Sequence, residues 1–148
     1  MTRGPWQTKT LDLAGEIALR RGPVYMCNAG RYDAFEIIIY EEWRNVFVKV
    51  RRSRSAIVHP FDILLEYRTD LTRLNRIPLT NITAREFWVR LPHGRWQFFL
   101  LTHDSVVEIQ ANGLHIPRMV LPVPVADLRR EEPSSEPESS GSPTEEGE

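Results

Sequence analysis

Residues 45–54 read NVFVKVRRSR, and their side chains alternate between two kinds. Every second residue from position 46 to position 50 is a valine, while the other side of the chain carries Lys49 and Arg51. Alternation with a period of two predicts a β-strand with one buried face. Two more arginines, Arg52 and Arg54, follow at once, so the expected strand combines a valine-rich face with a row of positive charges.

The rest of the chain is expected to surround this strand with helices and further strands. Helices are expected at residues 7–21 and 61–77, where apolar residues recur every three or four positions and a glycine or proline follows. Residues 103–113 are expected to form a short final helix, and residues 119–125 an extended segment or edge strand. The fold class is therefore α/β, with a mixed sheet of about five strands flanked by helices. Besides residues 45–52, the expected strands are 24–28, 34–40, 84–91 and 94–101.

Charge divides the chain into two parts. The 148 residues include 19 basic and 20 acidic side chains, and residues 127–148 hold eight of the acids and two of the bases. This leaves 17 basic and 12 acidic side chains in residues 1–126. The C-terminal part is rich in Glu, Ser and Pro, a composition typical of disorder. We therefore expect one α/β domain at residues 1–126 and a disordered acidic tail at residues 127–148.

The sequence disfavours several classes of protein. One cysteine, Cys27, gives no disulfide within the chain, and the four histidines show no spacing typical of a zinc site. No N-terminal apolar run resembles a signal peptide, and no stretch approaches the roughly 20 apolar residues of a membrane span. Motifs for a serine nucleophile or a phosphate-binding loop are absent, so no small-molecule cofactor is expected. The expected location is the cytoplasm, away from membranes.

Three segments carry a resemblance to a known group of proteins. They are AFEIIIY (34–40), FVKVRR (47–52) and EFWVRLPHGRWQFF (86–99). Together with the order of elements over roughly residues 7–101, they make the chain similar to the PD-(D/E)XK nuclease superfamily, which includes archaeal Holliday junction resolvases and restriction-type endonucleases. The resemblance implies a restriction endonuclease-like core of the order αβββαββ. In that core the second and third strands carry the acids and the lysine that hold a divalent metal.

The chain departs from the family pattern at two of these positions. The family has an acid or glutamine where this chain has Lys49, and a lysine where it has Arg51. A divalent cation such as Mg²⁺ needs carboxylate ligands, so Lys49 would repel it. Arg51 does not deprotonate and cannot shuttle a proton, although it can bind phosphate.

The resemblance still gives candidate site residues. Candidate catalytic residues are Glu36, Lys49, Arg51 and Glu16, and candidate ligands for Mg²⁺ are Glu36 and Asp33. Each of the acids also has a plainer interpretation: Asp33 as a turn residue and Glu16 as an exposed helix residue. For Glu36 the alternative is an ion pair with Lys49 or Arg51 across neighbouring antiparallel strands, which would balance charge without a metal.

A basic surface and an aromatic strand pair suggest nucleic-acid binding. Trp88 and Trp96 are expected to lie near one another, either as part of the core or as a platform on which an unpaired base stacks. The acidic tail can compete with nucleic acid for a basic surface, or serve only to keep the chain soluble. The basic residues have the alternative of an ordinary solvated face. Candidate phosphate-binding residues are Arg51, Arg52, Arg54 and Arg31.

These features predict a nucleic-acid-associated protein with a resolvase-like or endonuclease-like fold, in which cleavage is weak or lost. DNA is the expected partner, and a homodimer agrees with the resemblance. Two alternatives stay open: a non-catalytic protein-interaction module on the same scaffold, and an active Mg²⁺-dependent DNA endonuclease. The sequence therefore leaves open whether the protein is an enzyme.

Overall fold

The fold is organised around a single seven-stranded sheet with the strand order β1-β2-β3-β4-β5-β6-β7. The computed structural model describes residues 5–27, 34–55, 59–116 and 123–124. The strands are β1 (Val24–Met26), β2 (Ile37–Tyr40), β3 (Asn45–Arg52), β4 (Thr83–Arg90), β5 (Trp96–Leu101), β6 (Ser105–Ile109) and the two-residue β7 (Val123–Pro124). The expectation of about five strands was thus too low, because β6 and β7 extend the sheet.

The sheet is mixed because one pair of neighbouring strands is parallel. Strands β3 and β4 run parallel over eight residue pairs, from Asn45↔Thr83 to Arg52↔Arg90, while the other five pairs of neighbours are antiparallel. Parallel neighbours cannot be joined by a hairpin, so the chain must cross over one face of the sheet. Helices α2 (Pro60–Glu66) and α3 (Arg68–Leu74) make this crossover. The order of one helix, three strands, a helical crossover and a parallel strand confirms the expected core.

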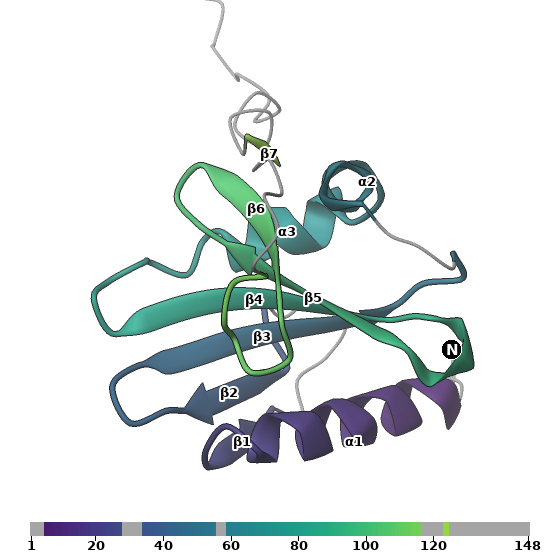
Figure 1. Ribbon diagram of the computed structural model, residues 1–148, viewed down its shortest axis with the longest axis horizontal. Coiled ribbons are helices and arrows are strands. Elements are labelled where there is room, and N and C mark those ends of the chain that lie inside the picture. The colour runs from purple at the N-terminus through teal and green to yellow at the C-terminus, as the bar shows by residue number, and fades with distance from the viewer. Residues whose placement is uncertain (1–4, 28–33, 56–58, 117–122, 125–148) are drawn as a thin grey trace, which may run out of the picture.

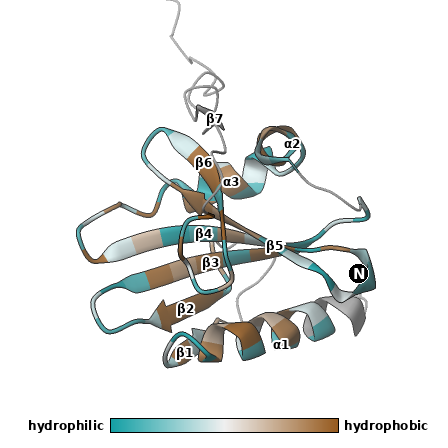
Figure 2. Cartoon of the chain, viewed as in Figure 1, coloured by the Kyte–Doolittle hydropathy of each residue, from teal (hydrophilic) through white to brown (hydrophobic). Residues whose placement is uncertain are grey.

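Helices cover both faces of the sheet (Figure 1). Helix α1 (Pro5–Leu19) packs its small residues Ala14 and Ala18 against one face, where the valines of β3 are buried. Helices α2 and α3 cover the other face, over the aromatic and aliphatic residues of β4, β5 and β6. Figure 2 shows hydrophobic residues along β2, β3 and α1, as the alternation in residues 45–52 predicts. Lys49 and Arg51 therefore point to the α2–α3 face.

The helix expected at residues 61–77 is two helices in the structure, and it ends earlier than expected. The break falls at Tyr67, whose φ of −116° and ψ of 31° are not helical. The Tyr67 ring packs against Phe87 with centroids 5.1 Å apart, and its hydroxyl donates to the Arg52 carbonyl at 3.2 Å. These contacts hold the side chain against the sheet, and the helix axis changes direction there.

The helix expected at residues 103–113 is wrong, because this segment forms β6. Its register pairs Val107 with Leu100 and Val106 with Leu101. Val106 and Ile109 are buried, so sheet pairing with β5 covers apolar surface that an isolated helix would have exposed. The chain reaches β6 through a tight turn in which Ser105 N–H donates to Thr102 Oγ1 at 2.9 Å.

The two ends of the chain are described only in part. Within the segment expected to be extended, Val123–Pro124 forms β7 and pairs with β6 at the edge of the sheet. The tail expected at residues 127–148 lies outside the described residues, as does the rest of residues 117–125. Among the residues that the structure describes, no helix has the length and apolar character needed to cross a membrane.

Candidate functional site

Four charged side chains meet on the α2–α3 face of the sheet, and we call them the Glu36 cluster. Its members are Glu36, Lys49, Arg51 and Asp70. The Lys49 Nζ atom lies 2.8 Å from Glu36 Oε1 and 4.0 Å from Asp70 Oδ1. The Arg51 guanidinium lies 3.3 Å from Glu36 Oε1 and donates to the two oxygens of Asp70 at 2.7 and 2.9 Å. Two acids thus balance two bases.

Strand pairing brings Glu36 and Lys49 together. Ile37 pairs with Val48, so Glu36, one residue before β2, stands opposite Lys49. The Glu36 N–H donates to the Val48 carbonyl at 2.9 Å, and the Val50 N–H donates to Glu36 Oε2 at 2.9 Å. The ion pair between Glu36 and Lys49, which is one of the sequence interpretations of Glu36, is therefore present, and Lys49 is completely buried.

Asp70 closes the cluster from the opposite side. It lies in the first turn of α3, which the helical crossover places over β3. Its carboxylate receives Nε and an Nη of Arg51 in a bidentate pair, a geometry that suits guanidinium better than ammonium. Burial works to lower the pKa of Arg51, but the hydrogen bonds and negative charge of Asp70 and Glu36 outweigh it and raise that pKa above its ordinary value. The Arg51 cation is therefore held firmly in place.

The Glu36 cluster does not fit a divalent metal. All four carboxylate oxygens are engaged: Glu36 Oε1 by Lys49 and Arg51, Glu36 Oε2 by the Val50 amide, and both Asp70 oxygens by Arg51. A metal ion would need those oxygens as ligands and would lie beside two positive charges. Among the described residues, no group of three or more His, Cys, Asp or Glu side chains is placed to hold a metal ion.

The remaining candidate acids do not join this cluster. Glu16 is exposed on α1, which covers the opposite face of the sheet. Asp33 and the candidate phosphate-binding residue Arg31 lie outside the described residues. The structure therefore brings Glu36, Lys49 and Arg51 together, and it separates them from Glu16.

The proposed stacking platform is wrong for Trp88. Its indole is completely buried and packs edge-on against Phe98, with ring centroids 5.1 Å apart. Trp96 is half-buried and its ring is stacked with that of Phe98, with centroids 6.2 Å apart. Arg85, on the same strand as Trp88, is buried and donates to backbone carbonyls just after α3 and β5. Burial alone lowers the pKa of Arg85 to about 10.

Basic residues gather at the end of the sheet where β3 and β4 terminate, and we call this the arginine end. Arg52 and Arg90 are neighbours in register, and Arg90 pairs with Trp96 at the start of β5. Arg90 also donates to Thr10 Oγ1 of α1 at 3.1 Å, so α1 begins close to this end. The arginine end consists of Arg52, Arg54, Arg90 and Arg95, of which all but the half-buried Arg90 are exposed. Arg51 does not belong to it, because the Glu36 cluster holds its guanidinium.

A second group of charges lies on the α1 face, and we call it the Glu86 cluster. Its members are Arg21, Glu41, Arg44 and Glu86. The Arg21 guanidinium donates to both oxygens of the fully buried Glu86 at 2.7 and 2.8 Å. It also lies 3.3 Å from Glu41, which accepts from Arg44 Nε at 2.7 Å. The Trp88 indole N–H donates to Glu86 at 2.9 Å, which explains why this buried tryptophan needs no solvent contact.

Burial and ion pairing act in opposite directions in the Glu86 cluster. Burial works to lower the pKa of Arg21, but the bonds and charges of Glu86 and Glu41 raise it above its ordinary value. Burial also works to raise the pKa of Glu41, whereas the hydrogen bonds from Arg44 and Arg21 lower it below its ordinary value. Arg21 and Glu41 therefore both keep their charges near neutral pH.

Three acids of these two clusters, Asp70, Glu41 and Glu86, are absent from the candidates found in the sequence. Asp70 lies on a helix with many polar residues, and nothing in a single sequence marks it. Glu86 directly precedes the apolar residues Phe87, Trp88 and Val89, and a charged residue beside such a run indicates a buried, paired side chain. That signal could have located Glu86, although it could not have named Arg21 as its partner.

The comparisons with known proteins concern the fold. No protein-family model matches the chain, and no curated protein matches its sequence. Among solved structures, the chain is similar to Hjc of Archaeoglobus fulgidus, a Holliday junction resolvase from an archaeal hyperthermophile. The match covers 68% of this chain and 86% of that chain, with a TM-score of 0.36 and 12% sequence identity.

Proposed function

We propose that this protein associates with nucleic acid on a nuclease-like scaffold and does not cleave it. The observation that carries this proposal is the engagement of all four carboxylate oxygens of Glu36 and Asp70 by internal donors. Lys49 and Arg51 supply the positive charge that a metal ion would otherwise bring. Without a metal, the site has no group that lowers the pKa of an attacking water.

Association with nucleic acid is supported by the arginine end. Arg52 and Arg90 are adjacent in register, and Arg54 and Arg95 are exposed beside the ends of the same strands. Arg54 and Arg95 make no ion pair within the described part of the chain, so their guanidinium groups are open to a ligand. Arginines that contact phosphate release counterions, and binding then weakens as salt rises.

Binding is tested by measuring the affinity for duplex and branched DNA at two salt concentrations. The double variant Arg52→Ala/Arg54→Ala is expected to weaken binding and to reduce the salt slope by roughly 2, about one unit for each lost phosphate contact. Arg76→Ala is a matched control, because Arg76 is exposed near the opposite end of the sheet. Unchanged affinity in the double variant, or no binding by the wild type, would overturn the nucleic-acid part of the proposal.

Cleavage is tested separately with plasmid and branched DNA in Mg²⁺ or Mn²⁺. We expect no cutting by the wild type, even at high protein concentration. Glu36→Ala serves to detect a true activity: metal-dependent cutting by the wild type that this change abolishes would show an active endonuclease. The Mg²⁺ expected from the resemblance would then have to bind in a rearranged cluster.

A protein-interaction module is the second candidate, and exposed aromatic residues favour it. Three aromatic residues are exposed near the β1 edge of the sheet: Tyr25, Tyr40 and Trp43. The Arg44 guanidinium lies over the Trp43 ring in a cation–π contact, 4.6 Å from the ring centroid. The outer side of β1 is an edge, where backbone groups can pair with another chain. A second copy of this chain is the simplest partner, and light scattering tests it. If the wild type is dimeric, Tyr25→Ser should make it monomeric. A monomeric wild type would exclude a second copy as the partner, and the partner would then have to be a different protein.

A further inference from the structure

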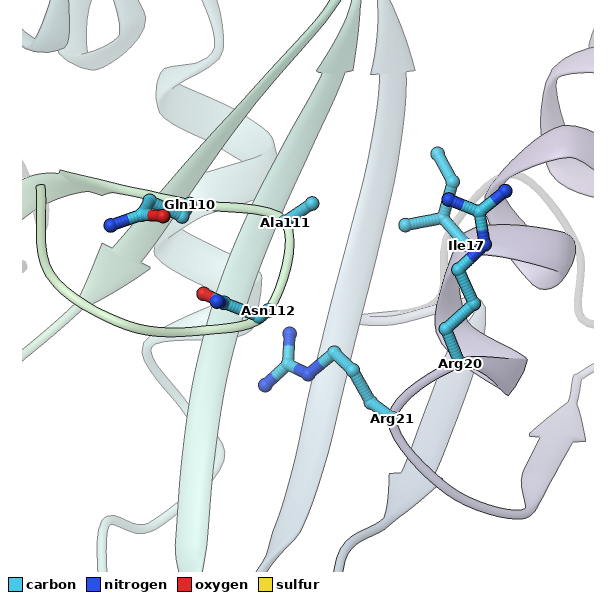
Figure 3. Close-up of a pocket in the computed structure, with 6 residues that line it drawn as sticks. All are labelled: Ile17, Arg20, Arg21, Gln110, Ala111 and Asn112. Carbon is cyan, nitrogen blue, oxygen red and sulfur yellow. The ribbon is translucent and has the colours of Figure 1, made fainter.

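A pocket of about 290 Å³ lies on the α1 face, away from both the Glu36 cluster and the arginine end. It opens between the end of α1 and the loop that follows β6 (Figure 3). Ile17, Arg20 and Arg21 line it from the helix side, and the loop residues line it from the other side. The loop residues are Gln110, Ala111 and Asn112.

The inner wall of the pocket is rigid. Figure 3 shows Arg21 reaching from the end of α1 toward Asn112. Its guanidinium is fixed by Glu86 and Glu41, so it keeps its position whether or not a ligand is present. A guanidinium has five N–H donors, and the bonds to these two acids use four of them. The Glu86 cluster is neutral in sum, so Arg21 adds shape and one donor without adding net charge.

The rim of the pocket offers three polar groups of known direction. Gln110 uses its NH₂ group on the His115 carbonyl, which leaves its side-chain oxygen as an acceptor. Asn112 uses its side-chain oxygen on the Leu114 N–H, which leaves its NH₂ group as a donor. Arg20 is exposed and makes no ion pair with the described residues, so its positive charge is available. Ile17 on the helix side and Ala111 on the loop side are the apolar residues of the lining.

We propose that this pocket binds a single nucleotide, with the base edge at Gln110 and Asn112 and the phosphate at Arg20. Nucleobase edges carry neighbouring acceptors and donors, which amide side chains can pair with. The volume lies at the small end of ligand pockets, so it suits one nucleotide and excludes a duplex. The nucleotide can be free or an unpaired residue of a strand. This inference does not depend on the proposed function, because the arginine end is a separate surface.

Calorimetric titration of the full chain tests this site. The probes are the four ribonucleoside 5′-monophosphates, the matching nucleosides, inorganic phosphate and a short single-stranded oligonucleotide. At least one monophosphate is expected to bind more tightly than its nucleoside and than phosphate, because base and phosphate both contribute. Tighter binding of the oligonucleotide than of any monophosphate would identify the strand as the source, and the reverse would identify a free nucleotide.

Two variants separate the roles of the rim groups. Arg20→Ala is expected to weaken monophosphate binding about tenfold and to leave nucleoside binding unchanged. Asn112→Ala is expected to weaken both, and to reduce the discrimination among bases. Arg76→Ala, a change of another exposed arginine, should alter neither. No binding of any monophosphate at millimolar concentration, or equal binding by wild type and Arg20→Ala, would overturn the proposal. Failure of nucleic-acid binding at the arginine end would overturn the proposed function but not the nucleotide pocket, because the two surfaces are separate.

Discussion

The Glu36 cluster and the Glu86 cluster lie on opposite faces of the same sheet, and each joins two acids to two bases. They differ in the cation at the centre. Lys49 is the buried cation of the Glu36 cluster, a point charge with one acid at 2.8 Å and a second at 4.0 Å. Arg21 is the buried cation of the Glu86 cluster, a planar fork that matches both oxygens of Glu86.

The clusters also differ in how the chain assembles them. Glu36 and Lys49 come from neighbouring strands of one hairpin, so local pairing is enough to bring them together. Glu86 and Arg21 come from β4 and the end of α1, and they meet only when the whole domain has folded. The Glu36 cluster therefore fixes charge mainly within one pair of strands, whereas the Glu86 cluster fastens the end of α1 to β4.

The largest effect is expected from breaking the Glu86 cluster with Glu86→Ala. This change leaves the buried Trp88 indole N–H without its acceptor, and it leaves the Arg21 guanidinium with Glu41 as its one remaining acid partner. The free energy of unfolding should fall by about 4 kcal/mol, as for other buried pairs that lose one partner. Urea unfolding measures this loss of stability. Glu42→Ala is the control: Glu42 is exposed next to Glu41 in the sequence, and its change should cost less than about 0.5 kcal/mol. A loss below about 1 kcal/mol for Glu86→Ala would contradict the assigned role.

A somewhat smaller effect is expected from Lys49→Met in the Glu36 cluster. The thioether fills most of the space of the lysine, and Arg51 still compensates Glu36 and Asp70. The expected loss is about 3 kcal/mol. In a double-mutant cycle, adding Glu36→Gln should cost about 2 kcal/mol less than the two separate changes predict. Strict additivity would mean that the two side chains do not interact.

Gly113→Ala is expected to cost about 2 kcal/mol, from backbone strain together with a clash against the Glu86 cluster. Gly113 has a φ of +86°, and an added Cβ would lie 2.5 Å from an Nη atom of Arg21. Gly94→Ala is the matched control: Gly94 has a φ of +73°, but its Cβ would meet nothing within 4 Å. Thermal unfolding should therefore show a loss of about 1 kcal/mol for Gly94→Ala, from backbone strain alone. Equal losses in the two variants would remove the contact with Arg21 as a cause.

The smallest expected effect is on how the free energy of unfolding depends on pH below neutrality, through Glu41. The pKa of Glu41 is lowered in the folded protein, so its contribution to stability is complete above its ordinary pKa of 4.5. This contribution is lost as the pH falls through the lower folded value. Glu41→Gln should therefore show a shallower fall in stability below about pH 4.5 than the wild type, whereas Glu42→Gln should follow the wild type. A Glu41→Gln profile parallel to the wild type would show that Glu41 does not sense acid.

Much of the fold could be predicted from local pattern, because that pattern depends on neighbouring residues. The alternation in residues 45–52 predicted β3 with its bounds and its two faces. The failures fall where a distant partner decides. Residues 103–113 are short and apolar enough for a helix or a strand, and pairing with β5 selects the strand. The single helix expected at residues 61–77 divides because Tyr67 packs on Phe87.

The same division holds for the candidate site. The sequence by itself offered an ion pair of Glu36 with Lys49 or Arg51 as one alternative, because the expected strands are neighbours along the chain, and the register of those strands decided for Lys49. Only the tertiary structure decided that Asp70 would close the cluster, because the position of α3 depends on packing across the whole α2–α3 face. It also decided the Glu86 cluster, whose two central residues are 65 positions apart. Side-chain charge is written in the sequence, but whether a charge meets phosphate, a metal or another side chain depends on which elements pack around it.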